Sequence, residues 1–278
     1  MLAGLYRSSA ASVGNESGGE NVANERPIIH MPPELSIIIP AYNEGERLRR
    51  GLSRIRDYFA SRPGGVAGIE IVVVDDGSTD ETARIAYDWA RDMPSLRLVS
   101  NPQNRGKGHS VRHGMLEARG RVAIFTDADL SAPIEESEKL LKAIRDGNDV
   151  AIGSRALDRS LIFGHQSRLR EVAGIIFNGF VRVFTGLPFR DTQCGFKAFV
   201  RERCLIIFDH QRIERFGFDP EILFLARRHG LRIAEVPVRW AHDPETKVHM
   251  IRDSLMMFGD LVHIRWNWLL GRYPAKRS

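Results

Sequence analysis

The chain is poor in cysteine, with Cys194 and Cys204 as the only two among 278 residues. Two cysteines do not build the disulfide framework that stabilises a small secreted protein. Neither belongs to a Cys-x-x-Cys pair or to a Cys/His cluster with the spacing of zinc ligands. The sequence therefore gives no support for a disulfide scaffold or a zinc site, and it predicts two ordinary thiols in a reducing compartment.

Long apolar runs are also missing. A transmembrane helix needs about 20 consecutive apolar residues. The nearest candidate, residues 172–189, is interrupted by Asn178, Arg182 and Pro188. We therefore expect no spanning helix. Residues 1–33 are polar, show no signal-peptide pattern and are expected to form a disordered N-terminal segment.

The charge balance is moderately basic, with a net charge of +5. This excess leaves three anionic partners open: a nucleic acid, a phosphorylated ligand or an anionic lipid surface. Aromatic residues do not interleave with basic ones, as a stacking platform for single-stranded nucleic acid requires. We therefore expect no nucleic-acid partner.

Short β-branched runs alternate with helical patterns through the first half of the chain. The expected strands are 35–39, 69–75, 96–100, 121–127 and 149–155, with helices at 43–62, 77–92, 106–120 and 133–147. Right-handed crossovers make such a series into one sheet with helices on both faces. The sequence thus predicts the α/β class and a doubly wound, mostly parallel sheet.

The second half of the chain is less regular. We expect a helix near 165–185, a loop over 185–199, a strand at 231–240 and an amphipathic C-terminal helix from about 249. This pattern predicts one α/β domain over residues 34–248, followed by a helix and tail over residues 249–278.

Polar segments stand where the expected strands end. These segments are "PAYNE", "DDGSTD", "TDADLS" and "GSR", with "NRGKG" in the loop after the third strand. The carboxyl ends of parallel strands meet at one edge of a doubly wound sheet, and ligands bind there. The sequence therefore predicts a binding site at this edge.

Asp127 and Asp129 close the expected fourth strand. Positions i and i+2 of a strand lie on the same side, so the two carboxylates would repel each other without a cation between them. A hard divalent cation such as Mg²⁺ or Mn²⁺ binds to one or two carboxylates together with substrate phosphates. The plainer alternative is that one aspartate caps a helix beginning at Pro133.

Two further segments offer contacts for a nucleotide. Asp75 and Asp76 are either turn residues before a helix or acceptors for a base edge or a ribose hydroxyl. Lys107 stands between glycines at an expected helix start, which suits a phosphate contact. The third glycine of a dinucleotide-binding motif is absent, because Val111 stands there, and Gly108 rules out a P-loop.

Together, "IIIPAYNE", "VVVDDGSTD", "NRGKG", "TDADLS" and "GSR" resemble the family-2 glycosyltransferases of GT-A fold. The later segments "RDTQCGFKAF", "ERFGFDPEILFLARRHG" and "EVPVRWAHDPETKVHM" look like the polyprenyl-phosphate branch, most like the dolichyl-phosphate β-glucosyltransferases. The resemblance extends from about residue 34 to residue 271.

The resemblance implies an inverting, metal-dependent transfer of glucose or a similar hexose from a UDP-sugar to a polyprenyl or dolichyl phosphate. It also implies roles for the residues that match the motifs. Pro40, Tyr42 and Glu44 would contact the nucleoside, Asp75 or Asp76 the base, and Lys107 the uridine or phosphates. Asp127 and Asp129 would reach the metal and the ribose, with Arg155 and Gln193 near the reacting phosphates.

The nature of the acceptor decides which side chains catalysis needs. A lipid phosphate is already anionic at neutral pH and needs no general base, but cations must screen its repulsion from the donor. The candidate cations are Arg155, Arg168, Arg170, Arg190, Lys197 and Lys247. A saccharide or other hydroxyl acceptor would instead need a carboxylate base, for which Asp219 is the first candidate.

Two amphipathic helices favour a lipid acceptor. The helix near 165–185 and the C-terminal helix each carry a wide apolar face with aromatic residues and a narrower polar stripe. Such helices lie in a membrane interface or pack on the core of their own domain. We expect a protein of the cytoplasm that associates peripherally with the inner face of a membrane.

The sequence leaves an alternative open for the transferred sugar and another for the enzymatic activity. The segment "DADLS" is similar to mannose-phosphate synthases, which use GDP-mannose, whereas "RDTQCGFK" is similar to the glucose enzymes. The alternative to an enzyme is a silent module that binds nucleotide sugars without turnover.

Overall fold

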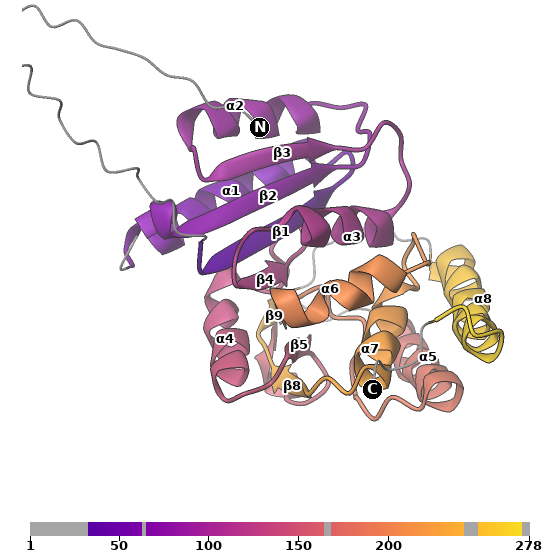
Figure 1. Cartoon of the computed structure of the whole chain (residues 1–278). Coiled ribbons are helices and arrows are strands. Elements are labelled where there is room, and N and C mark those ends of the chain that lie inside the picture. The colour runs from indigo at the N-terminus through magenta and orange to yellow at the C-terminus, as the bar shows by residue number, and fades with distance from the viewer. Residues whose placement is uncertain (1–32, 63–64, 164–167, 242–249, 274–278) are drawn as a thin grey trace, which may run out of the picture. The chain divides into compact units, whose positions relative to one another are not determined.

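The computed structural model describes residues 33–62, 65–163, 168–241 and 250–273, with side chains not described at 67, 168–171 and 250–254. The predicted disordered segment therefore lies almost entirely outside the described residues. A seven-stranded sheet in the order β3-β2-β1-β4-β7-β5-β8 forms the centre of the fold (Figure 1). The strands are β1 Leu35–Ala41, β2 Ile69–Asp75, β3 Leu96–Ser100, β4 Val122–Phe125, β5 Val150–Ser154, β7 Lys197–Val200 and β8 Ile233–Pro237.

Eight α-helices surround the sheet in the described residues. They are α1 Gly45–Ala60, α2 Thr82–Asp92, α3 Lys107–Glu117, α4 Ser137–Arg145, α5 Arg168–Thr185, α6 Arg201–His210, α7 Phe218–Arg228 and α8 Met250–Leu269. In Figure 1, α3 and α6 lie in front of the sheet and α1 lies behind it. This arrangement confirms the predicted doubly wound, mostly parallel architecture.

Each face of the sheet has its own apolar core, because successive side chains of a strand point to opposite faces. Ile37 and Ile39 of β1 belong to the core formed with α1, α2 and α4. Ile38, between them, belongs to the core formed with α3, α6 and α7. Both cores are fully enclosed, which explains why β1 and β2 are almost continuously apolar.

The structure corrects the prediction in the second half of the chain. The expected loop over 185–199 contains most of β7, which pairs antiparallel with both β4 and β5. Its four residues are too few to give a recognisable strand pattern. The expected strand 231–240 is divided between β8 and a short strand β9 Trp240–Ala241, which pairs with β6 Ile162–Phe163 in a separate small sheet.

The helix expected to begin at Pro133 also starts later than predicted. Residues Ile134–Glu136 form a 3₁₀ turn, and α4 begins at Ser137. Among the described residues, no helix combines the length and the apolar character needed to cross a bilayer.

Candidate active site

The strand order places a topological switch point between β1 and β4. From β1 the chain proceeds outward to β2 and β3 and then returns to β4 on the other side of β1. The loops that follow β1 and β4 therefore lead away in opposite directions, and such a switch point is where doubly wound sheets bind ligands. The segment after β4 contains Asp127 and Asp129.

The two aspartates lie in a turn and not on a strand. β4 ends at Phe125, and the Leu130 N–H donates to the Asp127 carbonyl at 3.1 Å. Leu130 has a φ of 50°. The expectation that strand pleating brings the carboxylates together was therefore wrong, because a tight turn does so.

Asp129 is held by the residue that follows this turn. Its Oδ1 accepts a hydrogen bond from the Ser131 N–H at 2.8 Å, and its Oδ2 accepts one from the Ser131 hydroxyl at 2.9 Å. Burial raises the pKa of Asp129, the negative charge of Asp127 raises it further, and the bonds from Ser131 oppose both effects. The carboxylate is thus fixed in position beside a like charge.

Lys107 supplies the nearest cation. Its Nζ lies 2.5 Å from Asp127 Oδ1, although Lys107 begins α3 and Asp127 lies in the turn after β4. Burial lowers the pKa of Lys107, but the charges of Asp127, Asp219 and Asp129 outweigh it and raise the pKa above its usual value. Lys107 therefore stays charged and offsets the acidic pair.

A second lysine is buried beneath this group. Lys197 is fully buried, donates to the Cys194 carbonyl at 2.6 Å and forms a close ion pair with Asp219. Lys197 was predicted as a cation for substrate phosphates, and the structure gives it an internal partner instead. Asp219, the candidate base for a hydroxyl acceptor, is only 4% exposed and is held by this lysine.

Arg155 is clamped by Asp191. Its Nε and Nη2 donate to the two carboxylate oxygens at 2.7 and 2.9 Å, and its backbone N–H donates at 3.0 Å. The guanidinium also lies 5.5 Å from the centre of the Trp240 ring. Burial raises the pKa of Asp191, but Arg155 and its hydrogen bonds prevail and lower it to about 2. The pair fixes the loop before β7 to the end of β5.

The same loop carries Gln193 and Gly195. The Nε2 of Gln193 is buried with no hydrogen-bond partner among the described atoms. Gly195 touches Asp127 so closely that an added Cβ would lie 2.9 Å from its Cγ. A donor group without a partner and a tight approach to the acidic turn both mark this loop as one wall of the site.

The loops after β1 and β2 form the opposite wall. Asn43, with a φ of 53°, accepts from the Thr79 N–H at 2.8 Å, and its own N–H donates to Ser78 Oγ at 2.9 Å. Tyr42 is 39% exposed, and Glu44 pairs with Arg47 at 3.0 Å. Pro40 lies in β1 opposite Val74. These contacts hold a rigid edge beside an exposed aromatic ring.

Asp75 and Asp76 differ in the number of hydrogen bonds that their carboxylates accept from the protein. Asp76 accepts from the Gly106 N–H and from Asn101 Nδ2, each at 2.7 Å, and from the Arg105 N–H. Asp75 accepts from the Ser78 N–H at 3.1 Å. Asp76 therefore shapes the loop that leads to Lys107, whereas the Asp75 carboxylate accepts fewer hydrogen bonds in the described structure; both residues are buried.

The carboxylates of the site fit a divalent cation whose remaining coordination positions are filled by the phosphates of a nucleotide. Within the described parts of the chain, no group of three His, Cys, Asp or Glu side chains is arranged to hold a metal alone. Asp127 and Asp129 offer hard oxygen ligands, and Mg²⁺ typically takes one or two carboxylates plus substrate phosphates. The predicted Mg²⁺ or Mn²⁺ is thus compatible with these residues.

Comparison with known proteins identifies the family. The profile of glycosyl transferase family 2 matches residues 36–203. The chain is also 37% identical to a dolichyl-phosphate beta-glucosyltransferase of Saccharomyces cerevisiae, with 88% of this chain and 78% of that protein aligned. The chain belongs to glycosyl transferase family 2. The human dolichyl-phosphate beta-glucosyltransferase is 33% identical, with 88% of this chain and 79% of that protein aligned.

Solved structures share the GT-A fold of this glycosyltransferase. Glucosyl-3-phosphoglycerate synthase from Mycobacterium tuberculosis, in complex with Mn²⁺, UDP and glucosyl-3-phosphoglycerate, gives a TM-score of 0.58 at 19% identity. The alignment covers 88% of this chain and 82% of that one. Mannosyl-3-phosphoglycerate synthase from Rubrobacter xylanophilus also gives 0.58 at 19% identity, covering 88% and 77%.

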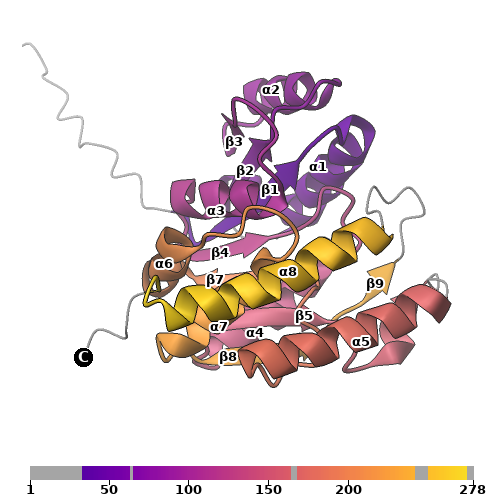
Figure 2. The same ribbon diagram turned by 90° about the vertical axis from the view of Figure 1, so that its right-hand side faces the viewer.

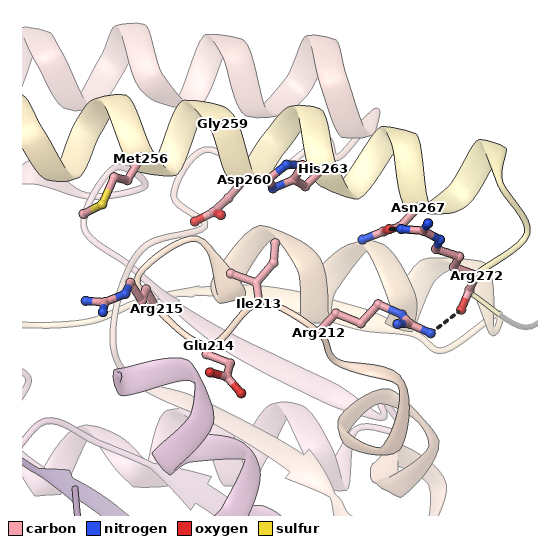
Figure 3. A pocket seen from close by; sticks show the side chains of 10 residues that line it. All are labelled: Arg212, Ile213, Glu214, Arg215, Met256, Gly259, Asp260, His263, Asn267 and Arg272. Carbon is pink, nitrogen blue, oxygen red and sulfur yellow. Dashed lines mark hydrogen bonds between the residues drawn. The ribbon is translucent and has the colours of Figure 1, made fainter. Parts of the chain in front are cut away.

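A cavity of about 690 Å³ opens beside the site of this glycosyltransferase, between α8 and the loop before α7 (Figure 3). Most of the side chains around it are polar or charged: Arg212, Glu214, Arg215, Asp260, His263, Asn267 and Arg272. None of the predicted site residues lines it. A cavity with this lining does not suit a polyprenyl tail.

The predicted site residues fall into three groups. Lys107, Asp127 and Asp129 come together, with Arg155 after β5 and Gln193 in the loop before β7 nearby, whereas Pro40, Tyr42, Glu44 and Asp75 occupy the opposite wall. Lys247 and the side chains of Arg168 and Arg170 lie outside the described residues. Arg190 is exposed, and its backbone N–H donates to Glu235 at 3.0 Å.

The sequence interpretation missed Asp191, Gly195 and Asn101. No local spacing signals them, because each acts on a residue far away in the chain. An arginine held in one orientation at a strand end needs a carboxylate partner, and this requirement is the one indication that could have led from Arg155 to a search for Asp191.

Proposed function

We propose that this glycosyltransferase transfers glucose from UDP-glucose to a dolichyl or related polyprenyl phosphate, with inversion at the anomeric carbon. The observation that carries the proposal is the grouping of Lys107 with Asp127 and Asp129 at the switch point of the sheet. The curated relatives, which align over most of the chain, support glucose and dolichyl phosphate as the substrate classes.

The nucleotide occupies the wall formed by the loops after β1 and β2. Tyr42 offers an exposed ring beside the nucleoside, and Asp75 accepts from the base or the ribose. The diphosphate lies near the start of α3, where the charged side chain of Lys107 contacts it. Asp127 and Asp129 would hold a divalent cation, which would neutralise charge on the leaving diphosphate; the structures that share the fold include one in complex with Mn²⁺ and UDP.

In the transfer step, an oxygen of the acceptor phosphate forms a bond to the anomeric carbon. The bond from that carbon to the diphosphate oxygen breaks, and UDP leaves with the electron pair. The acceptor oxygen carries no proton at neutral pH, so no general base is needed. Asp219 is consistent with this, because its carboxylate is buried and bound to Lys197.

Repulsion between the two phosphate-bearing substrates is screened by the loop before β7. Arg155, at the end of β5 and bound to Asp191 of this loop, supplies a permanent positive charge, and Gln193 has an amide N–H group with no hydrogen-bond partner among the described residues. Asp191 holds Arg155 in one orientation, which avoids the entropy loss of ordering a long side chain during the reaction.

The acceptor's lipid tail needs an apolar surface, and α5 and α8 provide one. The two helices lie side by side in Figure 2, joined by Phe258 packed edge-on against Phe180 and Phe184. Their outward apolar side chains are exposed: Val172, Ile175, Ile176, Val183, Leu255, Val262, Trp266 and Leu269. A row of this size favours peripheral contact with a membrane.

The orientation of α5 strengthens this interpretation. Its polar residues Asn178 and Arg182 donate to the Phe189 carbonyl at 3.1 and 3.2 Å, and its apolar residue Val181 is buried in the core. Its apolar residue Val183 is 81% exposed. α5 thus packs Val181 on the core and leaves other apolar side chains such as Val183 exposed, so it has more apolar surface than the core covers. This surplus suits a lipid surface, on the membrane face where nucleotide sugars are present, which we expect to be the cytoplasmic one.

A transfer assay with purified protein tests the proposal. Radiolabelled UDP-glucose or GDP-mannose is offered with dolichyl phosphate in detergent, with Mg²⁺, Mn²⁺ or EDTA, and label is counted in the organic extract. Glucose in the lipid fraction, lost with EDTA and with Asp129→Asn, is expected. If only GDP-mannose gives labelled lipid, the transferred sugar is mannose and not glucose. Label that appears only in aqueous product would exclude the lipid acceptor. Binding of UDP without any turnover would favour a silent module.

A further inference from the structure

Lys107 occupies the position where a divalent cation is needed. Its Nζ lies 2.5 Å from Asp127 Oδ1, one of the two residues that fit the metal. The negative charges of Asp129 and Asp219 also act on this ammonium group. A divalent cation that enters without a nucleotide therefore meets a positive charge already bound to one of its two carboxylates.

The other carboxylates leave Lys107 no alternative partner of equal quality. Asp219 is already paired with the buried Lys197. Both oxygens of Asp129 accept hydrogen bonds from Ser131. When Lys107 leaves Asp127, its charge needs a new anion, and the diphosphate of a nucleotide is the anion that this site is expected to receive.

Only the side chain of Lys107 is able to move. The Gly106 N–H is fixed by Asp76 at 2.7 Å, and the His109 N–H donates to the Glu214 carbonyl at 2.9 Å. An added Cβ on Gly106 or Gly108 would collide with the backbone of residues 213–215, which shows how tightly the start of α3 is packed. The four-carbon stem of lysine, by contrast, is flexible.

We propose that Lys107 holds the place of the metal in the donor-free enzyme and moves to the donor's diphosphate when the metal and the nucleotide bind. This inference rests on the proposed function, because it takes Asp127 and Asp129 as metal ligands. Lys107 thus has a second role besides contacting phosphate. Without nucleotide, the lysine competes with the metal for Asp127 and keeps the metal affinity low; with nucleotide, the lysine binds the diphosphate and no longer competes. Each ligand then raises the affinity for the other.

The test measures Mn²⁺ binding directly, from the electron paramagnetic resonance signal of free Mn²⁺, in wild type and in Lys107→Met. Without UDP, the variant is expected to bind Mn²⁺ about tenfold or more tightly than wild type, within the range typical of coupled sites. The gain in Mn²⁺ affinity on adding UDP is expected to be smaller in the variant than in wild type.

Two further variants separate charge from shape. Lys107→Arg keeps the cation, so its Mn²⁺ affinity without UDP should stay low, whereas Lys107→Gln should behave like Lys107→Met and replaces it if that variant fails to fold. Lys142→Met removes an exposed lysine of α4 that pairs with Asp146, and it controls for the change in net charge. It should bind Mn²⁺ as wild type does.

The outcomes distinguish this inference from the proposed function. If wild type binds Mn²⁺ in the presence of UDP but neither neutral variant binds it more tightly without UDP, Lys107 does not hold the place of the metal and the proposal is overturned. If no protein binds Mn²⁺ even with UDP, the metal role of Asp127 and Asp129 fails, and the proposed function loses that part.

Discussion

Gly195→Ala tests whether the loop before β7 sets the position of Asp127. A Cβ at residue 195 would lie 2.9 Å from Asp127 Cγ and 3.0 Å from Oδ1, and closer still to Oδ2. Because carbon contacts are comfortable only from about 3.5 Å, the carboxylate has to retreat by about 0.5 to 1 Å. The atoms that must move belong to the end of one side chain, so the backbone can stay in place.

Such a displacement affects catalysis far more than stability. A reacting group misplaced by about 1 Å can cost on the order of a hundredfold in rate, or about 2.7 kcal/mol of transition-state stabilisation. We expect kcat/KM for glucose transfer to fall by about that factor, while the free energy of unfolding changes by less than about 1 kcal/mol.

The matched control is Gly174→Ala in α5, where an added Cβ meets nothing within 4 Å. It should keep full activity and gain up to about 1 kcal/mol in stability, since alanine favours the helix. Radiolabel transfer and thermal melts on both variants complete the test. A Gly195→Ala enzyme with wild-type kcat/KM would refute the placement of Asp127 at the reacting centre.

Three other outcomes are expected. Asp191→Asn should lose about 2 kcal/mol of stability at pH 7, because the fold lowers the pKa of Asp191 from 3.8 to about 2. This contribution is present above pH 4 and disappears as the pH falls towards 2. The difference in melting temperature between Asp191→Asn and wild type should therefore shrink as the pH is lowered, and a difference that stays constant would contradict the ion pair. Asp75→Asn should raise KM for the nucleotide sugar with little change in melting temperature. Asp76→Asn should lower the melting temperature because it disturbs the hydrogen bonds from Gly106 and Asn101. Equal melting temperatures of the two variants would show that the two aspartates do not differ in this way. Val183→Asp, at an 81% exposed side chain of α5, should reduce co-sedimentation with anionic vesicles and leave stability unchanged. Tyr87→Asp adds the same charge at a 58% exposed side chain of α2 and should not reduce co-sedimentation; an equal loss in both variants would remove α5 from the membrane contact.

The first half of the fold was predictable because its pattern is local. Apolar runs such as 69–75 identify buried strands, and the helical segments between them impose right-handed crossovers. β7 was missed for the opposite reason. Four residues give no clear period, and the pairing of Lys197 with Phe125 and Ile152 joins segments that are far apart in the chain.

The amphipathic helices show a similar division. The pattern of α5 predicts an apolar face but not the direction in which that face points. The direction follows from Val181, which is buried in the core, and from Asn178 and Arg182, which bind carbonyl groups of the loop at 189–190; the wide apolar face therefore continues onto the exposed side at residues such as Val183.

The sequence by itself determined the class of fold, the edge of the sheet where ligands bind and the acidic, basic and aromatic residues gathered there. These follow from period, burial and the position of polar residues at strand ends, all of which are local properties. Only the tertiary structure decided the partners: Lys107 with Asp127, Lys197 with Asp219 and Arg155 with Asp191. A charged side chain can pair with any opposite charge within reach, and packing alone fixes which one that is.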